Sequence, residues 1–257
     1  MADEILCALA DGIATITLNR PDRRNALNTA MLEGLHRRFD ELERDARVRV
    51  VVIRGAGTAF CSGRDLEEMG RRQRDALEPE SDVISVFQQI EASSRPTIAM
   101  VHGAAYAGGC ELALHCDFRV AADVARFAMP LARLGLVVPF PLGQKLVEII
   151  GPAFTRQILL TGQPVDARRA YEMGMVHTVV PAAELERATD DLARTIAGNA
   201  PLSLAGMKAT IRRSAAFRDR IEHADLDEVA RRARASADAR EGVRAMLDKR
   251  KPIFRGE

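Results

Sequence analysis

The stretch that decides the fold is His-Gly-Ala-Ala-Tyr-Ala-Gly-Gly-Cys-Glu-Leu-Ala-Leu, at residues 102–114. It follows the apolar run Thr-Ile-Ala-Met-Val at residues 97–101, which is typical of a buried strand. Its small residues then give way, at Glu111, to a helical pattern. We therefore predict a strand, a glycine-rich turn and a helix, in that order.

A helix that begins in this way offers a site for an anion. Its first backbone N–H groups lack partners and carry about half a positive charge, and Gly108 and Gly109 let a ligand approach them closely. Glu111 lies one helical turn beyond Gly108, so its carboxylate and an N–H donor could face one pocket. That pairing suits proton transfer beside a carbonyl. The alternative is structural, since the helix dipole alone favours the glutamate and glycine pairs often serve close packing.

The composition is that of a globular protein and excludes several functions. Hydrophobic residues make up 47% of the 257 residues, which is enough for a substantial core. A net charge of +1 argues against nucleic acid as a partner, and the absence of tryptophan argues against base stacking. The sequence contains no membrane-length apolar run and opens without a basic and apolar leader, so we expect no membrane insertion and a cytoplasmic location.

Cysteine and histidine are not spaced as metal ligands. The cysteines Cys7, Cys61, Cys110 and Cys116 form no CxxC or Cys/His zinc pattern, and we expect buried thiols and no metal site. His102 and His115 lie in apolar surroundings. We interpret them as hydrogen-bonded core histidines rather than acid–base groups.

Strands alternate with helices along the chain, which predicts an α/β fold. Asp11 and Gly12 predict a type I′ hairpin, and Asn28 predicts the start of a helix that ends near residue 46. A strand over 48–53 leads to a small-residue turn and a short helix with Asp65 near its start, a second junction of the same design. Residues 70–81 lack an apolar period and predict a mobile loop, for which a lid is one interpretation.

The pattern from residue 184 onward is helical. We expect helices over 184–198, 201–213, 221–235 and 240–250, and we divide the chain into a core domain at 1–198 and a helical region at 199–257. These helices carry apolar stripes among many charges. The stripes either pack against their own domain or are buried on a neighbouring subunit.

Five motifs resemble one known family. The stretch Phe-Cys-Ser-Gly-Arg-Asp-Leu at 60–66 and the stretch at 102–112 look like the signature of the enoyl-CoA hydratase/isomerase (crotonase) family. Three further segments are similar to that family, at 20–27, 166–176 and 249–254. The motifs are collinear and run the length of the chain.

The resemblance implies a fold, a ligand and an assembly. The fold would be a core of repeated β-β-α turns wound as a spiral, with a helical C-terminal region that trimerises. The partners would be an acyl-CoA thioester and copies of the same chain, as a homotrimer or a dimer of trimers. Coenzyme A would be part of the substrate, so no separate cofactor is expected.

The resemblance also implies site residues. The backbone N–H groups of Arg64 and Gly108 would form an oxyanion hole, with Glu111 as acid/base. Contacts with the substrate and its CoA would involve Arg24, Ala26, Leu27, Ser62, Asp65, Leu66, Gly109, Leu131 and, from an adjoining subunit, Lys249. For Lys249 the alternative is a solvated surface charge.

The sequence departs from the family pattern at one position. Hydratases of the family use a second glutamate about twenty residues after the first, and Leu131 stands there. Our main hypothesis is a hydratase-like enzyme in which Glu111 is the single acid/base, assisted by water or by a side chain such as Glu68 or Arg133. Alternatives are a double-bond isomerase, since residues 136–140 are similar to that subgroup, and a non-catalytic acyl-CoA-binding member. Leu131 with Ala104 and Ala105 predicts an apolar acyl tunnel.

Overall fold

Two β-sheets are built from alternate strands of the chain. The computed structural model describes residues 3–75, 81–216 and 221–256. One sheet has the order β1 (Ile5–Ala10), β2 (Ile13–Leu18), β3 (Val50–Gly55), β5 (Thr97–Val101), β7 (Phe118–Ala122) and β10 (Thr178–Val180). The other has the order β4 (Ala59–Cys61), β6 (Ala104–Tyr106), β8 (Arg126–Ala128) and β9 (Val165–Asp166).

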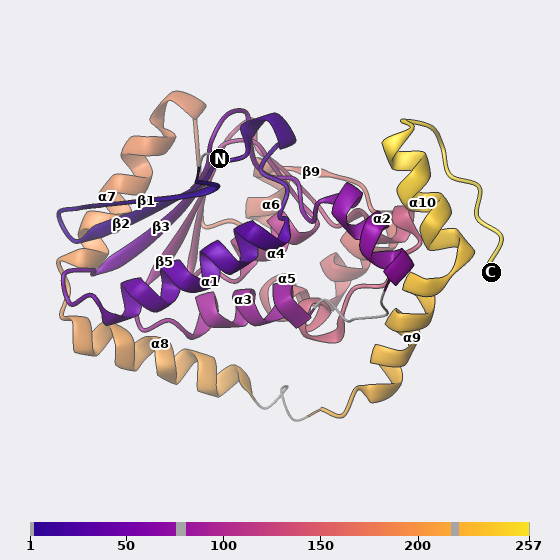
Figure 1. Ribbon diagram of the computed structural model, residues 1–257. Coiled ribbons are helices and arrows are strands. Elements are labelled where there is room, and N and C mark those ends of the chain that lie inside the picture. The colour runs from indigo at the N-terminus through magenta and orange to yellow at the C-terminus, as the bar shows by residue number, and fades with distance from the viewer. Residues whose placement is uncertain (1–2, 76–80, 217–220, 257) are drawn as a thin grey trace.

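Helices surround the sheets (Figure 1). They are α1 (Thr29–Arg44), α2 (Leu66–Asp75), α3 (Ser81–Ala92), α4 (Gly108–Leu114), α5 (Phe140–Thr161), α6 (Ala167–Glu172), α7 (Leu185–Ala197), α8 (Pro201–Ala215), α9 (Ala224–Ala235) and α10 (Ala237–Leu247). Short 3₁₀ helices lie at η1 (Pro21–Arg23), η2 (Pro130–Leu134) and η3 (Ala182–Glu184). The alternation confirms the predicted α/β class.

The β-β-α turn is the repeating unit. β3, β5 and β7 run parallel in the larger sheet, and each is followed by a strand of the smaller sheet, β4, β6 or β8. Helices α2 and α3 lead from β4 to β5, and α4 leads from β6 to β7, back in the larger sheet. After β8 the chain passes through η2, α5, β9 and α6 before it reaches β10. The turns implied by the family resemblance are therefore present.

Our prediction of one strand before each glycine-rich turn was incomplete. The residues Ala104–Tyr106 form β6, which pairs with β4 and β8 before α4 begins. A strand of three residues is too short to show a period in the sequence. Its partners lie far along the chain, so tertiary pairing decides that it forms.

Local signals placed the first elements correctly. Asp11 and Gly12 have φ angles of 50° and 78°, as a type I′ turn requires. The side chain of Asn28 accepts the N–H of Met31 and caps α1, which ends at Arg44.

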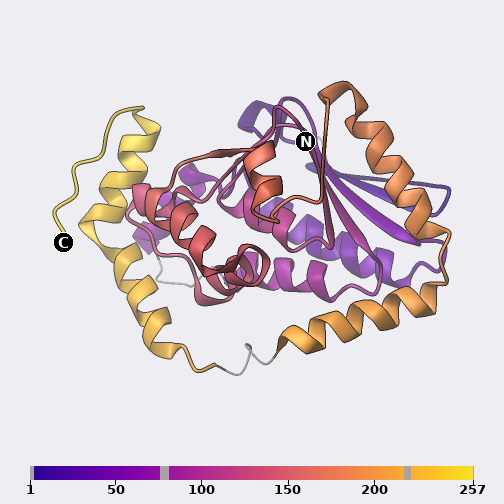
Figure 2. The same ribbon diagram turned by 180° about the vertical axis from the view of Figure 1, so that it is seen from behind.

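Both faces of the central strands of the larger sheet, β3, β5 and β7, are buried. In β3, Val51 and Ile53 belong to the main core, which also contains buried residues of α1, α3, α4 and α5. Val50 and Val52 point to the opposite face and pack beneath α7. Figure 2 shows α7 crossing that face of the sheet.

Two sequence expectations were wrong. α2 continues to Asp75 and α3 begins at Ser81, so much of the predicted loop at 70–81 is helical, while residues 76–80 lie outside the described part of the chain. Good helix formers sustain α2 without an apolar period. Cys7 is exposed, whereas the other three cysteines are buried as expected. It lies in the edge strand β1, in which only Ile5 is buried.

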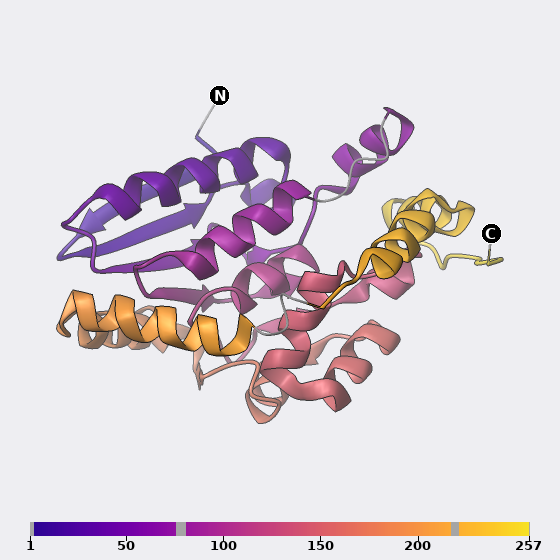
Figure 3. The same ribbon diagram turned by 90° about the horizontal axis from the view of Figure 1, so that it is seen from below.

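The C-terminal helices differ in how they pack. α10 packs closely on η2, since a Cβ on Gly242 would lie 2.4 Å from the carbonyl carbon of Leu134. α8 runs along one side of the molecule and exposes Leu202, Met207 and Ile211 (Figure 3). Of the two interpretations of the apolar stripes, α10 fits packing on its own domain, and the stripes of α8 remain open to solvent.

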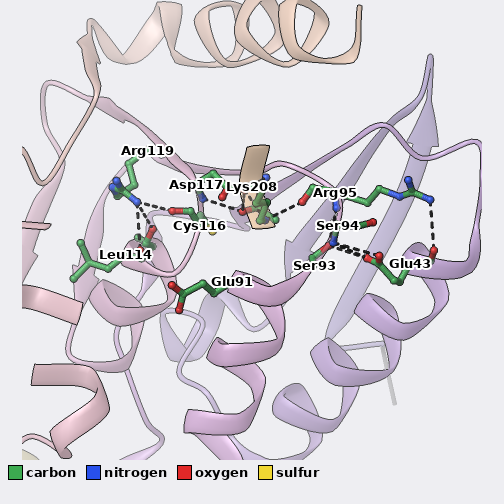
Figure 4. A network of polar contacts seen from close by, with 12 residues as sticks. Glu43, Glu91, Ser93, Ser94, Arg95, Leu114, Cys116, Asp117, Arg119 and Lys208 are labelled. Carbon is green, nitrogen blue, oxygen red and sulfur yellow. Dashed lines mark hydrogen bonds and ion pairs between the residues drawn. The ribbon is translucent and has the colours of Figure 1, made fainter. Parts of the chain in front are cut away.

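One ion pair fastens α8 to the core. The Lys208 Nζ lies 2.7 Å from the Asp117 Oδ2 and donates to the carbonyl of Arg95 (Figure 4). Asp117 also accepts the backbone N–H of Thr97, at the start of β5. The network therefore links α8 to the strand that leads to the central junction.

Candidate active site

A cavity of about 580 Å³ gathers most of the residues implied by the resemblance. Its lining includes Arg24, Ala26, Ser62, Arg64, Asp65, Leu66, Gly108, Glu111 and Leu131. The lining runs from the exposed residues Arg23 and Arg24 to the fully buried Glu111. Segments from both strand–turn–helix junctions thus meet in one site.

Three of the implied residues are not among the described residues that line this cavity. Leu27 is buried and pairs with Arg64 in an isolated parallel bridge, which joins the loop after η1 to the first junction. Gly109 serves close packing, because a Cβ there would lie 2.1 Å from the carbonyl oxygen of Cys61. Lys249 follows α10 on the exposed surface.

Two backbone amides lie close together at one wall. A Cβ on Gly108 would be 3.6 Å from the Arg64 amide nitrogen, and a Cβ on Gly63 would be 3.2 Å from the Gly108 amide nitrogen. Within the described chain, neither amide donates a hydrogen bond to a protein acceptor. Two adjacent free donors at helix starts form a candidate oxyanion hole.

Ala107 holds a strained turn that aims the Gly108 amide. Its φ of 48° and ψ of −119° suit glycine, and its own N–H donates to the carbonyl of Ala128 at 2.8 Å. Such backbone strain costs on the order of 1–3 kcal/mol and is often stored at functional sites. The strain is an observed feature that a composition or periodicity analysis cannot detect.

Replacing Ala107 by glycine should therefore raise the free energy of unfolding, by about 1 kcal/mol. Ala105→Gly is the matched control, because Ala105 lies two residues earlier, in β6, without a positive φ, and the variant should lose stability instead. Chemical denaturation of the two variants measures the difference. Equal destabilisation of both would show that the Ala107 turn carries no strain.

Glu111 is a buried carboxyl without a hydrogen-bond partner. The residue has an exposed fraction of 0%, and within the described structure neither carboxyl oxygen is bonded. Burial raises the pKa of Glu111 well above its ordinary value, and the charge of Lys145 opposes that rise. The side chain lines the cavity, so it is available to a bound molecule.

His115 supports Glu111 through the backbone. Its Nδ1–H donates to the carbonyl of Glu111 at 2.8 Å, and burial lowers the pKa of His115 to about 4. The Nδ1 also lies 3.9 Å from the Glu111 Oε2. The imidazole is neutral near pH 7, so this approach is not an ion pair. The prediction of a hydrogen-bonded core histidine is confirmed for His115.

The sequence analysis missed the residue that caps the end of α4. Arg119 is almost fully buried and donates to the carbonyls of Ala113, Leu114 and Cys116 (Figure 4). Its Nε donates to the carbonyl of Met175. A cation at the C-terminal end complements the helix dipole and fixes the helix that carries Glu111. The available signal was an arginine inside the apolar strand β7.

A second missed residue holds the first junction in place. The Arg20 guanidinium donates to the carbonyl of Ala26 and to the Asp65 Oδ2. The other oxygen of Asp65 accepts the N–H groups of Glu67 and Glu68 and caps α2. Asp65 thus lines the cavity while its carboxylate is occupied by structural contacts.

The inner wall of the cavity is largely apolar. It includes Val83, Phe87, Met129, Leu134 and Leu142, and α10 adds Met246 and Leu247, which the sequence analysis did not place there. Leu131 lies in this wall as expected, but Ala104 and Ala105 do not line the described cavity. The cavity therefore combines an apolar interior with a charged entrance.

The two helper residues considered from the sequence have different positions. Arg133 lines the cavity. Glu68 is not among the described lining residues, and its carboxylate instead accepts the backbone N–H and the hydroxyl of Thr29. Glu68 therefore stabilises the start of α1.

Within the described residues, no cluster of three or more histidine, cysteine or acidic side chains could hold a metal ion. None of the described helices is both long enough and apolar enough to cross a bilayer.

Known proteins are similar to this chain over almost its whole length. The profile of the family described as enoyl-CoA hydratase/isomerase matches residues 9–257. A short-chain-enoyl-CoA hydratase of Clostridium acetobutylicum is 32% identical, over 93% of this chain and 92% of that protein. A 2,3-dehydroadipyl-CoA hydratase of Escherichia coli is also 32% identical, over 98% of this chain and 99% of that protein.

Solved structures share the fold. A methylmalonyl-CoA decarboxylase in complex with 2-nitronate-propionyl-CoA superposes with a TM-score of 0.90 at 26% identity, covering 99% of each chain. An enoyl-CoA hydratase/isomerase from Xanthobacter autotrophicus Py2 gives a TM-score of 0.85 at 32% identity, covering 97% of each chain. The sequence match, the β-β-α architecture and the paired junctions agree, and the chain belongs to the enoyl-CoA hydratase/isomerase family.

Proposed function

We propose that this protein is a hydratase-like enzyme that acts on an acyl-CoA thioester through an enolate. The thioester oxygen would accept the N–H groups of Arg64 and Gly108, and Glu111 would transfer the proton. The observation that carries the proposal is a buried, unpartnered carboxyl in the same cavity as two unpartnered amides. The hydratases named among its relatives support water addition as the reaction.

The two amides would lower the barrier electrostatically. Charge develops on the thioester oxygen when a proton enters or leaves the α-carbon, and fixed N–H donors need no reorganisation to stabilise it. One such donor contributes roughly 3–4 kcal/mol to transition-state stability in well-studied enzymes. The apolar wall around Phe87 and Met129 would strengthen the effect by excluding water.

Glu111 would begin the cycle as a carboxylate. In hydration it would take a proton from the attacking water at the β-carbon and deliver a proton to the α-carbon. Leu131 supplies no second carboxyl, so one group would perform both transfers. The empty protein stabilises the neutral acid, and a bound substrate and water would provide the partners that the carboxylate lacks.

An isomerase remains the second candidate. A single carboxyl can move a proton between the α- and γ-carbons of an enoyl-CoA without water. The observation that favours it is the apolar environment of Glu111, where Leu131 contributes a hydrophobic wall instead of a base for water. A non-catalytic acyl-CoA-binding protein is the third candidate.

A panel of thioesters separates the three candidates. We expect water addition to 2-enoyl-CoA substrates. The readouts are the loss of conjugated-thioester absorbance and the mass of the product. Migration of the double bond in 3-enoyl-CoA substrates without water uptake would favour the isomerase. Tight acyl-CoA binding without turnover of any 2-enoyl-, 3-enoyl- or 3-hydroxyacyl-CoA would overturn the catalytic proposal.

The pH profile should report the raised pKa of Glu111. Because the carboxylate is the active form, kcat/KM should rise with pH, with a midpoint well above pH 4.5. Lys145→Met removes the charge that lowers this pKa and should shift the midpoint to higher pH. Lys208→Met is the control, because that half-buried lysine pairs with Asp117 instead. The same midpoint in the wild-type, Lys145→Met and Lys208→Met proteins would contradict the assignment of the profile to Glu111.

The remaining implied contacts belong to the same proposal. Arg24 and Ala26 at the entrance would bind the CoA portion, together with Ser62 and Leu66. The exposed apolar residues of α8 support self-association, as a homotrimer or a dimer of trimers in which Lys249 would approach the CoA of an adjoining subunit. Sedimentation at several protein concentrations would measure the assembly. A cytoplasmic location stays a prediction.

A further inference from the structure

The side chain of Arg64 has no role in the chemistry proposed above, which uses only its backbone. It lines the cavity, and its exposed fraction is 10%. A guanidinium in a largely apolar enclosure is costly unless its donors are used. The position of this side chain therefore needs an explanation of its own.

Protein contacts use only part of this guanidinium. Its Nη1 lies 3.2 Å from the Asp82 Oδ2, and its Nε is buried with no partner in the described structure. The Asp82 side chain is 34% exposed and does not line the described cavity. Arg38 and Arg54 also have an unpaired Nε, but their side chains are 29% and 36% exposed and lie outside the cavity.

None of the four acidic residues of the described lining, Asp22, Asp65, Glu67 and Glu111, pairs with Arg64. Asp65 is bound by Arg20, and Glu67 pairs with Arg23 at the entrance. The buried carboxyl of Glu111 makes no hydrogen bond, although it lines the same cavity. The described acceptors therefore leave the buried Nε of this cavity-lining arginine without a hydrogen bond.

We propose that Arg64 recognises a carboxylate on the acyl chain, so that the substrates are CoA thioesters of short dicarboxylic acids. This inference rests on the proposed acyl-CoA function and names its substrate class. A planar guanidinium matches a carboxylate through two parallel hydrogen bonds. A ligand carboxylate supplies the acceptors that the protein does not.

The backbone of the same residue limits where that carboxylate lies. The Arg64 amide would hold the thioester oxygen, and its side chain extends from the adjacent Cα. The guanidinium thus reaches acyl atoms a few carbons from the carbonyl and not the end of a long fatty chain. This geometry selects short dicarboxylic chains over long monocarboxylic ones.

Binding of matched, unreactive thioesters tests the inference without turnover. The probes are glutaryl-CoA and the corresponding thioester with its free carboxyl methylated, titrated into the full protein by calorimetry. We expect wild-type protein to bind glutaryl-CoA at least about tenfold more tightly than it binds the methylated thioester. Arg64→Met should weaken the binding of glutaryl-CoA by a factor of about 10–100 and the binding of the methyl ester by less than about threefold. The affinity of Arg64→Lys for glutaryl-CoA should fall between those of the wild-type protein and Arg64→Met.

Asp82→Asn provides an independent test with the opposite sign. The amide keeps the oxygen that accepts the Val83 N–H but removes the charge that competes for Arg64. Glutaryl-CoA should then bind about two- to fivefold more tightly, with no gain for the methyl ester. Arg168→Met, on the surface of α6, controls for general loss of positive charge.

The outcomes separate this inference from the proposal beneath it. Equal affinity for the two thioesters in wild-type protein overturns the carboxylate site alone. If Arg64→Met loses affinity equally for both thioesters and for free CoA, the side chain contacts a CoA phosphate. That result also overturns the carboxylate site. Failure of every thioester and of free CoA to bind overturns the acyl-CoA function, and this inference with it.

Discussion

Glu111→Gln should lower kcat/KM for the favoured enoyl-CoA by a factor of about 10²–10⁴, the usual effect of removing a general acid or base. The substitution keeps the shape of the side chain, and Glu111 is fully buried, so the oxyanion donors should stay in place. Substrate binding should change far less than turnover. Steady-state kinetics and acyl-CoA titrations on the same preparation measure the two effects.

The same substitution should stabilise the protein increasingly as pH rises. Burial raises the pKa of Glu111 in the folded state, so the neutral acid is favoured and ionisation costs stability. The contribution of the glutamate is fully present below about pH 4, near its unfolded pKa, and is lost as pH rises through the folded pKa. Between the unfolded and the folded pKa, glutamine gains about 1.4 kcal/mol per pH unit over glutamate, and above the folded pKa the difference stays constant.

Urea unfolding at a series of pH values checks this slope. Glu172→Gln is the control, because that glutamate is on the surface of α6 and pairs with Arg168 and Arg169. The free energy of unfolding of Glu172→Gln should vary with pH as it does in the wild-type protein. A Glu111→Gln variant with wild-type turnover would remove Glu111 from the mechanism, and one with no gain in stability at high pH would show that the carboxylate is solvated in the folded state.

Gly109→Ala should destabilise the fold by about 3 kcal/mol, which corresponds to a fall in Tm of about 6–12 °C. The new Cβ would lie 2.1 Å from the carbonyl oxygen of Cys61 and 2.8 Å from its Cβ. β4 cannot yield easily, because Cys61 is paired with Ala105 in the smaller sheet. α4 and β4 would have to separate, which moves the two junctions apart and weakens the candidate oxyanion hole.

The neighbouring glycine supplies the matched comparison. A Cβ on Gly108 meets its nearest atoms at 3.6 Å, an ordinary van der Waals distance. Gly108→Ala should therefore stay within about 1 kcal/mol of wild-type stability. Thermal unfolding of the two variants side by side measures the contrast, and equal Tm values would refute the close packing of α4 on β4.

Much of the fold could be predicted because its signals are local. The Asp11–Gly12 turn and the Asn28 cap each act within a few residues. The three-residue strands β4 and β6 could not be predicted from a period, since they form only when distant partners pair with them. α2 was misjudged at 70–75 because its helix propensity persists where an apolar stripe does not.

The candidate site divides in the same way. The sequence by itself determined the two glycine-rich helix starts, the retained Glu111 and the change to Leu131, because these are identities and spacings along the chain. The tertiary structure alone decided that the amides of Arg64 and Gly108 lie together and that Glu111 is buried without a partner.

The tertiary structure also decided the supports and walls of the site. Arg119 caps α4, and Met246 of α10, from the far end of the chain, lines the cavity. Hydrogen bonds within a turn depend on neighbouring residues and can be read from the sequence. Desolvation, close packing and charge pairing depend on which distant segments meet, so only the folded chain determines the protonation state of Glu111 and leaves the Nε of Arg64 without a partner.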